Sequence, residues 1–356
     1  MNDRAVSLLE QYEIEVLATR KGRGAILCDT DRGTLIFKEY VGSPQHLRVQ
    51  DRLLKTITAK GLVEAEQLLP TKEGSFSVKD HDGVSYLLKT YREGRECNVR
   101  ETEDCLAAVR LLAKLHLSTQ DGLMTAKELG EGVPDDVAEP EAQTENAEER
   151  NNAEERNNAE LPIFSIAAEY EKRNRELRKI RKFLLGRSQK TWFEIALLGC
   201  FDDFYEQARE AKEGWEAYRT AAEREPVTAY CHGDYQHHNV ILDQKTWVPV
   251  NFERCVKDDP VRDLHLLLRK LLEKSNWSVA LGERLLREYE KIRPLSAISK
   301  IDLYYRFSYP EKFWKIANFY YNSGKAWIPG KNLEKLEKIM AQKAEKKAFL
   351  EAAFRT

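Results

Sequence analysis

The residues best suited to carry out chemistry lie in one short stretch of the C-terminal half. His232, Asp234 and Asn239 have the H-x-D-x-x-x-x-N spacing of the catalytic loop of phosphoryl-transfer enzymes. In such loops the aspartate accepts the proton of the attacking hydroxyl, and the asparagine side chain binds magnesium. The spacing therefore predicts Asp234 as a catalytic base and Asn239 as a metal ligand.

A second metal-binding position is expected at the end of the next apolar strand. Phosphoryl-transfer enzymes carry an aspartate there, which binds the metal that bridges the nucleotide phosphates. This chain has Asn251 instead. A neutral amide is a much weaker ligand than a carboxylate for a hard cation. Because Glu253 lies two residues on and could turn inward to restore the charge, the predicted metal ligands are Asn239, Asn251 and Glu253.

Candidate nucleotide-binding residues lie in the first hundred positions. Lys38 ends an apolar strand directly before a predicted helix, which is the pattern of the lysine that pairs with the α and β phosphates. Gly22 and Gly24 lie where a phosphate-covering loop is expected, although G-x-G alone indicates a hairpin turn equally well. Thr90 and Tyr91 fall where a connector would present backbone groups to adenine, but any strand-to-helix connector looks similar.

The helix that follows Lys38 lacks a residue that the chemistry calls for. In active enzymes of this kind a glutamate of that helix pairs with the strand lysine. No glutamate occurs between Pro44 and Lys60, where Gln50 and Asp51 are the nearest substitutes. We therefore expect Lys38 to lack a full carboxylate partner.

The elements that must position these residues form a small mixed region followed by a larger helical one. Ser43 is a candidate N-cap and Gly61 a candidate C-cap of the single N-terminal helix. The alternating apolar patterns predict a five-stranded antiparallel sheet beside it. The extended segments are 14–17, 25–30, 34–40, 62–69, 76–79 and 84–91.

Beyond residue 94 helical periodicity dominates, with helices expected at 166–184, 193–218 and 261–274. Between 126 and 160 the composition changes to Glu, Asn, Ala and Pro, and one short motif is repeated almost verbatim. This segment buries little and is predicted to be an acidic disordered insertion outside the core. The expected domains are an N-lobe over 1–93 and a C-lobe over 94–356 that contains the insertion.

Composition excludes some partners. The chain is 42% hydrophobic, and its 57 basic and 59 acidic residues give a formal charge of -2. No global field is present that would recruit nucleic acid or an anionic membrane, so neither is an expected partner. The six cysteines form no C-x-x-C pair, and no run is long enough to span a bilayer. A cytoplasmic protein with reduced thiols is therefore expected.

Several longer segments carry a family resemblance. They are 231–240 (CHGDYQHHNV), 250–253 (VNFE), 261–264 (VRDL), 309–316 (YPEKFWKI), 320–323 (YYNS), 34–40 and 88–97. In these segments the chain resembles the CotS-type spore coat proteins, a branch of the aminoglycoside phosphotransferase and choline kinase group. The resemblance covers nearly the whole chain except the acidic insertion. It implies an α+β, two-lobed, protein-kinase-like fold with a small antiparallel-sheet N-lobe and a larger, mainly helical C-lobe.

The resemblance also implies roles for individual residues. Asp234 matches the catalytic base, Asn239 a magnesium ligand and Lys38 the phosphate-binding lysine. Asp263 matches the buried aspartate that braces the catalytic loop, in which His232 is structural. Asn251 departs from the phosphotransferase pattern. These matches predict that Lys38, Asp234, Asn239 and Asn251 converge, with Asp263 buried beneath and bonded to the backbone near His232.

Three functions remain open after the resemblance. The chain is an active ATP-dependent kinase of a small hydroxylated molecule or coat component, a degenerate kinase or scaffold of the coat, or a protein that binds nucleotide as a signal. We favour a coat-associated kinase-like protein with weak or lost activity. ATP and Mg²⁺ are expected as cofactors if it is active, and otherwise none. The implied partners are other spore coat proteins and nucleotide, and the implied location is the mother-cell cytoplasm with assembly onto the coat.

Overall fold

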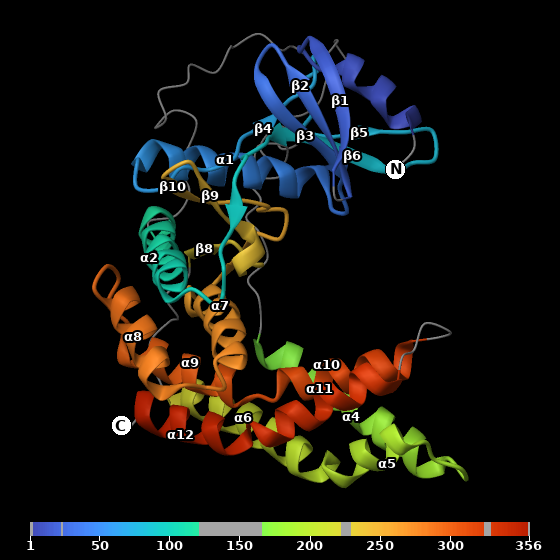
Figure 1. Ribbon diagram of the computed structural model, residues 1–356, viewed down its shortest axis with the longest axis vertical. Helices are drawn as coiled ribbons and strands as arrows, with labels where there is room; N and C mark the ends of the chain where they lie inside the picture. Colours follow the sequence, from blue (N-terminus) through green and yellow to red (C-terminus); the bar gives the residue numbers. More distant parts are fainter. Residues whose placement is uncertain (1–2, 23, 121–165, 222–228, 324–328, 355–356) are drawn as a thin grey trace, which may run out of the picture. The chain divides into compact units, whose positions relative to one another are not determined.

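The computed structural model describes residues 3–22, 24–120, 166–221, 229–323 and 329–354 (Figure 1). Contacts divide these residues into two compact units. The first unit holds the described residues up to 120 together with 229–263, and the second holds 166–221 and the residues from 264 onward. The boundary expected at 93/94 falls inside the first unit, so that division stays a prediction. The predicted insertion at 126–160 lies outside the described residues.

An antiparallel sheet with six strands forms the N-terminal part of the first unit. A five-stranded sheet was predicted, although the sequence offered six extended segments. The strands follow the order β1-β2-β3-β6-β4, and β5 pairs with β6 as well. Strand β6 therefore has three partners and lies at the centre of the hydrogen-bonded network. The strands are β1 Val16–Gly22, β2 Ala25–Thr30, β3 Gly33–Glu39, β4 Leu68–Leu69, β5 Val78–Lys79 and β6 Ser85–Thr90.

Helix α1 (Pro44–Lys60) has the ends that the sequence predicts. The Ser43 hydroxyl accepts the backbone N–H of His46 at 3.1 Å, which satisfies one of the donors left free in a first turn. Gly61 adopts the left-handed conformation (φ 65°) and its N–H donates to the Thr58 carbonyl. Both caps are therefore confirmed.

Short strands and one helix complete the first unit around the catalytic-loop motif. Strand β9 pairs with both β10 and β7, and β11 pairs with β8. Gly94 precedes β7 and passes so close to β9 that a Cβ would lie 2.2 Å from the Leu242 carbonyl oxygen, so a side chain is excluded there. The elements are β7 Arg95–Glu96, α2 Thr102–Thr119, β8 Ala229–Cys231, β9 Val240–Asp243, β10 Thr246–Pro249 and β11 Val256–Asp258.

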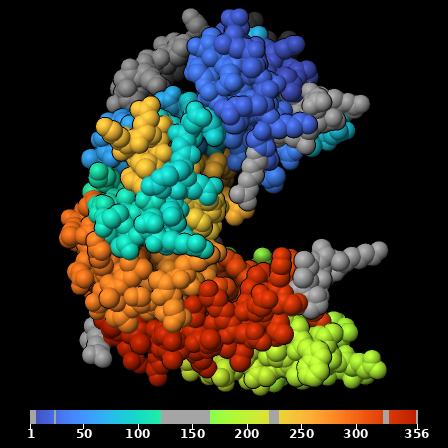
Figure 2. Space-filling model, in the orientation of Figure 1, coloured from blue at the N-terminus to red at the C-terminus, as the bar shows by residue number. Residues whose placement is uncertain are grey.

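The second unit is helical within its described residues. Aromatic stacking ties its core together, as between Tyr170 and Tyr309, whose ring centres are 3.9 Å apart. Figure 2 shows the red C-terminal helices lying directly beside the yellow-green α4–α6 group. The helices are α4 Ile166–Gly186, α5 Trp192–Gly199, α6 Phe201–Ala221, α7 Val261–Lys274 (shared with the first unit), α8 Val279–Glu290, α9 Ala297–Ser308, α10 Glu311–Asn322, α11 Pro329–Ala341 and α12 Lys343–Ala353.

One helix prediction is wrong. The segment 193–218 was expected to be a single helix, but the chain breaks at Cys200 between α5 and α6. The apolar pattern continues across the break because both helices pack on the same core, so periodicity gave no sign of it. Among the described helices, none is long and apolar enough to cross a bilayer.

The N-cap of α1 gives a test of the fold. Replacing Ser43 by Ala leaves the His46 N–H without its side-chain acceptor and should lower the free energy of unfolding by about 1 kcal/mol. Ser43→Asp, which supplies another acceptor, should keep most of the stability. Urea unfolding followed by circular dichroism measures both variants. Equal stability of Ser43→Ala and the wild type would contradict the cap assignment.

Candidate active site

The catalytic-loop motif begins where β8 ends and is shaped by a glycine. Gly233 has φ 80°, and a Cβ on it would lie 1.8 Å from the Arg254 carbonyl oxygen. No other residue fits that position, because both the backbone conformation and the space exclude a side chain. The loop therefore lies directly against the segment that carries Asn251 and Glu253.

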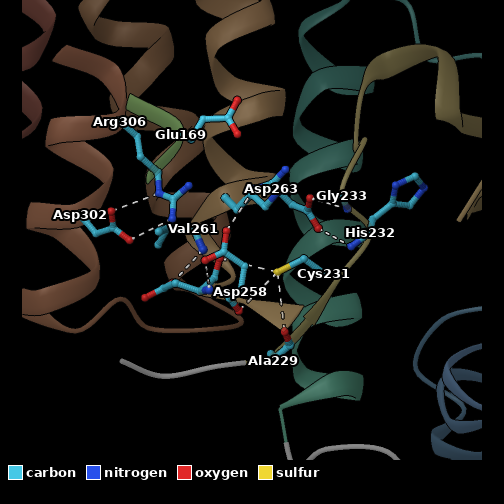
Figure 3. Close-up of polar contacts among 12 residues, drawn as sticks. Glu169, Ala229, Cys231, His232, Gly233, Asp258, Val261, Asp263, Asp302 and Arg306 are labelled. Atoms are coloured by element: carbon cyan, nitrogen blue, oxygen red, sulfur yellow. Dashed lines mark hydrogen bonds and ion pairs between the residues drawn. The ribbon is translucent and has the colours of Figure 1, made fainter. Parts of the chain in front are cut away.

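Asp263 braces the loop at His232 and Gly233 (Figure 3). It is fully buried, and its carboxylate accepts the backbone N–H groups of His232 at 2.6 Å and Gly233 at 2.9 Å. The His116 ring nitrogen lies 3.5 Å from the same carboxylate. Burial would raise the pKa of Asp263, but His116, His232 and Arg262 together outweigh it and the net pKa is lowered. The predicted contact between Asp263 and the loop backbone is confirmed.

His232 has a structural position in the loop. Its Nδ1 accepts the backbone N–H of Asp234 at 3.2 Å, so the ring proton must be on Nε2, which donates to the Val250 carbonyl at 2.9 Å. Tyr235, also buried, donates from its hydroxyl to the Ala108 carbonyl of α2. These bonds fix the loop to the residue that follows β10 and to α2, and Asp234 is half-buried at the tip of the loop.

A chain of hydrogen bonds joins the four residues that were predicted to converge. The Asn239 side-chain nitrogen donates to the Asp234 carbonyl at 2.8 Å, and the Asn251 side-chain nitrogen donates to Asn239 Oδ1 at 3.0 Å. Asn251 Oδ1 lies 3.5 Å from the Lys38 ammonium. The structure thus brings Lys38, Asp234, Asn239 and Asn251 together within the first unit.

Lys89 is a central residue that the sequence reasoning missed. It lies on β6, is 1% exposed, and its ammonium contacts three side chains. Its Nζ lies 2.9 Å from Glu66 Oε2, 2.9 Å from Asn251 Oδ1 and 2.6 Å from Glu253 Oε1. All three ammonium hydrogens are thereby used. Burial would lower the pKa of Lys89, but Glu66 and Glu253 raise it, so the lysine stays charged.

Glu66 completes this centre from the segment before β4. Its carboxylate accepts the backbone N–H of Asn251 at 2.9 Å and of Phe252 at 3.1 Å, in addition to the Lys89 ammonium. Asn251 has φ 69°, an uncommon conformation for a residue other than glycine. These two backbone bonds hold the chain in that conformation.

The sequence did contain a signal for the importance of Lys89, because Lys89 is a charged residue that ends the apolar run 86–88 of a central strand.

Lys38 has a carboxylate partner, contrary to expectation. Its ammonium lies 3.2 Å from Glu253 Oε1, and its side chain is 24% exposed. Gln50 and Asp51, the expected substitutes for the missing glutamate of α1, are not this partner. Asp51 pairs with Lys55, and Gln50 is buried with no partner for either side-chain polar atom among the described residues. The partner of Lys38 therefore comes from the segment after Asn251, because that segment is held against the sheet.

The electrostatics of the centre do not fit a magnesium ion. Burial would raise the pKa of Glu253, but the ammonium groups of Lys89 and Lys38 lower it, so its charge is already balanced. The Asn239 and Asn251 amides are hydrogen-bonded to each other and carry no charge. Two ammonium groups near these oxygens repel a divalent cation. The three predicted metal ligands thus lie close together, but the cation that Asn251 and Glu253 contact is the Lys89 ammonium.

The other predicted nucleotide-binding residues lie in the sheet. Gly22 ends β1, opposite Ala25, and Gly24 (φ 68°) is in the turn of that hairpin. The Thr90 N–H donates to the Gln67 carbonyl and the Tyr91 N–H to the Thr34 carbonyl. Neither N–H remains available to a purine. Whether these four residues contact a nucleotide stays a prediction.

A family model describes part of the chain. The model named Spore coat putative kinase YutH matches residues 215–353, which confirms the predicted likeness to kinase-like spore coat proteins over that range. No curated protein matches the chain significantly.

Solved structures show the fold over the whole chain. An aminoglycoside phosphotransferase from Alicyclobacillus acidocaldarius is 18% identical, with a TM-score of 0.72 over 99% of this chain and 95% of that one. Amicoumacin kinase hAmiN, solved in complex with AMP-PNP, Ca²⁺ and Ami, is 12% identical, with a TM-score of 0.56 over 98% of this chain and 94% of that one. A choline/ethanolamine kinase family protein from Mesorhizobium loti is 13% identical, with a TM-score of 0.50 over 99% and 96%. The predicted fold, an N-terminal antiparallel sheet followed by a mainly helical region, is confirmed.

Lys89 gives a stability test of the charge centre. Lys89→Met leaves the buried carboxylates of Glu66 and Glu253 without their main cation and should lower the free energy of unfolding by about 3–5 kcal/mol. The control Lys347→Met removes an ion pair with Glu351 in which both side chains are exposed, and it should cost no more than about 1 kcal/mol. Urea unfolding measures both. Similar small losses in the two variants would show that Lys89 carries no buried pair.

The lowered pKa of Glu253 predicts a pH dependence. Because its folded-state pKa lies below the unfolded value of about 4.3, the ionised glutamate stabilises the protein fully above that value and loses this contribution as pH falls through the folded-state pKa. The stability difference between wild type and Glu253→Gln should therefore be constant from pH 7 to 5 and shrink below pH 4. Glu93→Gln, at an exposed position, is the control. A difference that grows on acidification would contradict the assignment.

Proposed function

We propose that this protein is a kinase-fold component of the spore coat whose phosphotransfer centre is degenerate, so that transfer is weak or absent. The spore coat part rests on the family model that matches residues 215–353. The observation that carries the degenerate part is the position of the Lys89 ammonium, at hydrogen-bond distance from Asn251 and Glu253. An ammonium that is part of the chain takes the place of the charge that a metal would supply.

The remaining residues have defined tasks under this proposal. Lys38 is partly exposed and has one contact at 3.2 Å and one at 3.5 Å, so it retains the capacity to donate to a nucleotide phosphate. Asp234 is at the position of the base, with its Oδ1 accepting from the side chain of Gln236. Nucleotide binding would then depend on ammonium groups and be insensitive to divalent metal. Other coat proteins remain the proposed partners.

An active ATP-dependent kinase is the second candidate. Two observations favour it: the catalytic loop is fully braced by Asp263, and Asp234 is held at its tip by bonds to the backbone. An active enzyme of this class needs metal ions to neutralise charge on the transferring phosphoryl group. Metal dependence of nucleotide binding therefore separates the two candidates.

Asn251→Asp is the informative substitution. The Asn251 nitrogen lies 3.0 Å from Asn239 Oδ1, and adjacent oxygens of an octahedral magnesium site are about 3 Å apart because each Mg–O bond is about 2.1 Å. The substitution replaces that nitrogen by a charged oxygen without a change of shape. The hydrogen bond is lost, and a cation between the two oxygens would relieve their repulsion.

Titration calorimetry with ATP tests the proposal. The wild type should bind ATP with equal affinity in Mg²⁺ and in EDTA and show negligible turnover. Asn251→Asp should gain affinity by about tenfold or more in Mg²⁺ alone. Asp234→Asn should leave binding unchanged and abolish any residual transfer. Asn98→Asp, an exposed position, controls for added charge. Metal-dependent binding with steady turnover in the wild type would establish the active kinase instead. If neither the wild type nor Asn251→Asp binds ATP, a structural role in the coat is the function that remains.

A further inference from the structure

A cavity lies entirely within the helical unit and uses no residue of the kinase motif. Its volume is about 530 Å³, which is in the range of small-molecule sites. Helices α6, α7, α9, α10 and α12 line it, and aromatic rings supply much of its wall. These rings include Trp277, which is 5% exposed, and Tyr304 and Tyr305 of α9. An apolar ring would pack well here.

The carboxylates inside the cavity are already paired. Arg269, which is 6% exposed, donates to Glu273 at 2.9 Å and to Glu311 at 3.3 Å, and Lys312 lies 3.1 Å from Glu273. The Arg269 Nε is buried and has no acceptor in the described part of the chain. The interior therefore has a spare donor on a buried cation and no spare carboxylate.

Lys346 adds a second cation, one that has no carboxylate partner among the described residues. It lies on α12 with its ammonium 5.5 Å from the centre of the Trp277 ring. Within the described residues, no carboxylate lies within ion-pair distance of it and no acceptor bonds to its ammonium. Burial lowers the pKa of Lys346 to about 8, and Arg269 lowers it as well, against the opposing effect of Glu273 and Glu311. A bound anion would stabilise this ammonium.

Charges at the mouth restrict the kind of anion. Lys343 is paired with Asp203 at 2.8 Å, and Glu206 with Arg209. Glu210 also lines the cavity from α6 and is exposed. Such a mouth disfavours a doubly charged phosphate more than a singly charged carboxylate, because repulsion scales with charge.

We propose that this cavity binds a small aromatic carboxylate. The carboxylate accepts hydrogen bonds from the Lys346 ammonium, and the ring packs against Trp277 and the α9 tyrosines. The site uses residues of the helical unit alone, so it does not rest on the proposed function.

Calorimetric titration with a matched pair of probes tests this site. 2-Naphthoate should bind, and 2-naphthalenemethanol, which has the same ring system without the charge, should bind at least about tenfold more weakly. Lys346→Met should remove this discrimination, and Lys346→Arg should restore most of it. Lys338→Met, at an exposed position of α11 that does not line the cavity, is the control and should behave as wild type.

Folding of each variant is checked by circular dichroism, and if Lys346→Met fails to fold, Lys346→Gln replaces it. Equal affinity for the acid and the alcohol would overturn the proposal. So would undiminished binding of 2-naphthoate to a folded Lys346→Met protein. Absence of 2-naphthoate binding at its solubility limit would overturn it as well.

Discussion

One buried ammonium group organises the centre of this protein. Lys89 reaches from the central strand of the sheet to Glu66, Asn251 and Glu253, and it is almost completely shielded from water. Transfer of a lone ammonium or carboxylate into such surroundings costs several kcal/mol, so these groups are stable only in each other's presence. The sheet, the segment before β4 and the segment after β10 are thereby held together by charge.

Several further features follow from that constraint. Because Glu66 accepts the N–H groups of Asn251 and Phe252, Asn251 keeps a left-handed backbone conformation that glycine adopts more readily than other residues. Because Glu253 turns toward the two lysines, Lys38 gains the carboxylate that α1 does not provide. The Asn251 amide is then left to bond with Asn239. The arrangement resembles a metal-binding centre in its geometry, with a lysine as the cation.

The sequence predicted those parts of the fold that depend on local patterns. The caps of α1 follow from Ser43 and Gly61, whereas the brace at Asp263 was implied by the family resemblance. The pairing of Lys89 could not be predicted, because it joins residues that are far apart in the chain and depends on how the sheet folds. The break at Cys200 was missed because both flanking helices bury the same face. The partner of Lys38 was missed because the search was confined to one helix.

The central claim is that Lys89, and not a metal ion, orders the segment at Asn251. Hydrogen exchange at the backbone amides of Asn251 and Phe252 tests it most directly, since both donate to Glu66. The account predicts that both amides are strongly protected in EDTA without nucleotide, and that Mg²⁺-ATP adds little protection. Rapid exchange in EDTA that becomes slow only with Mg²⁺-ATP would contradict it.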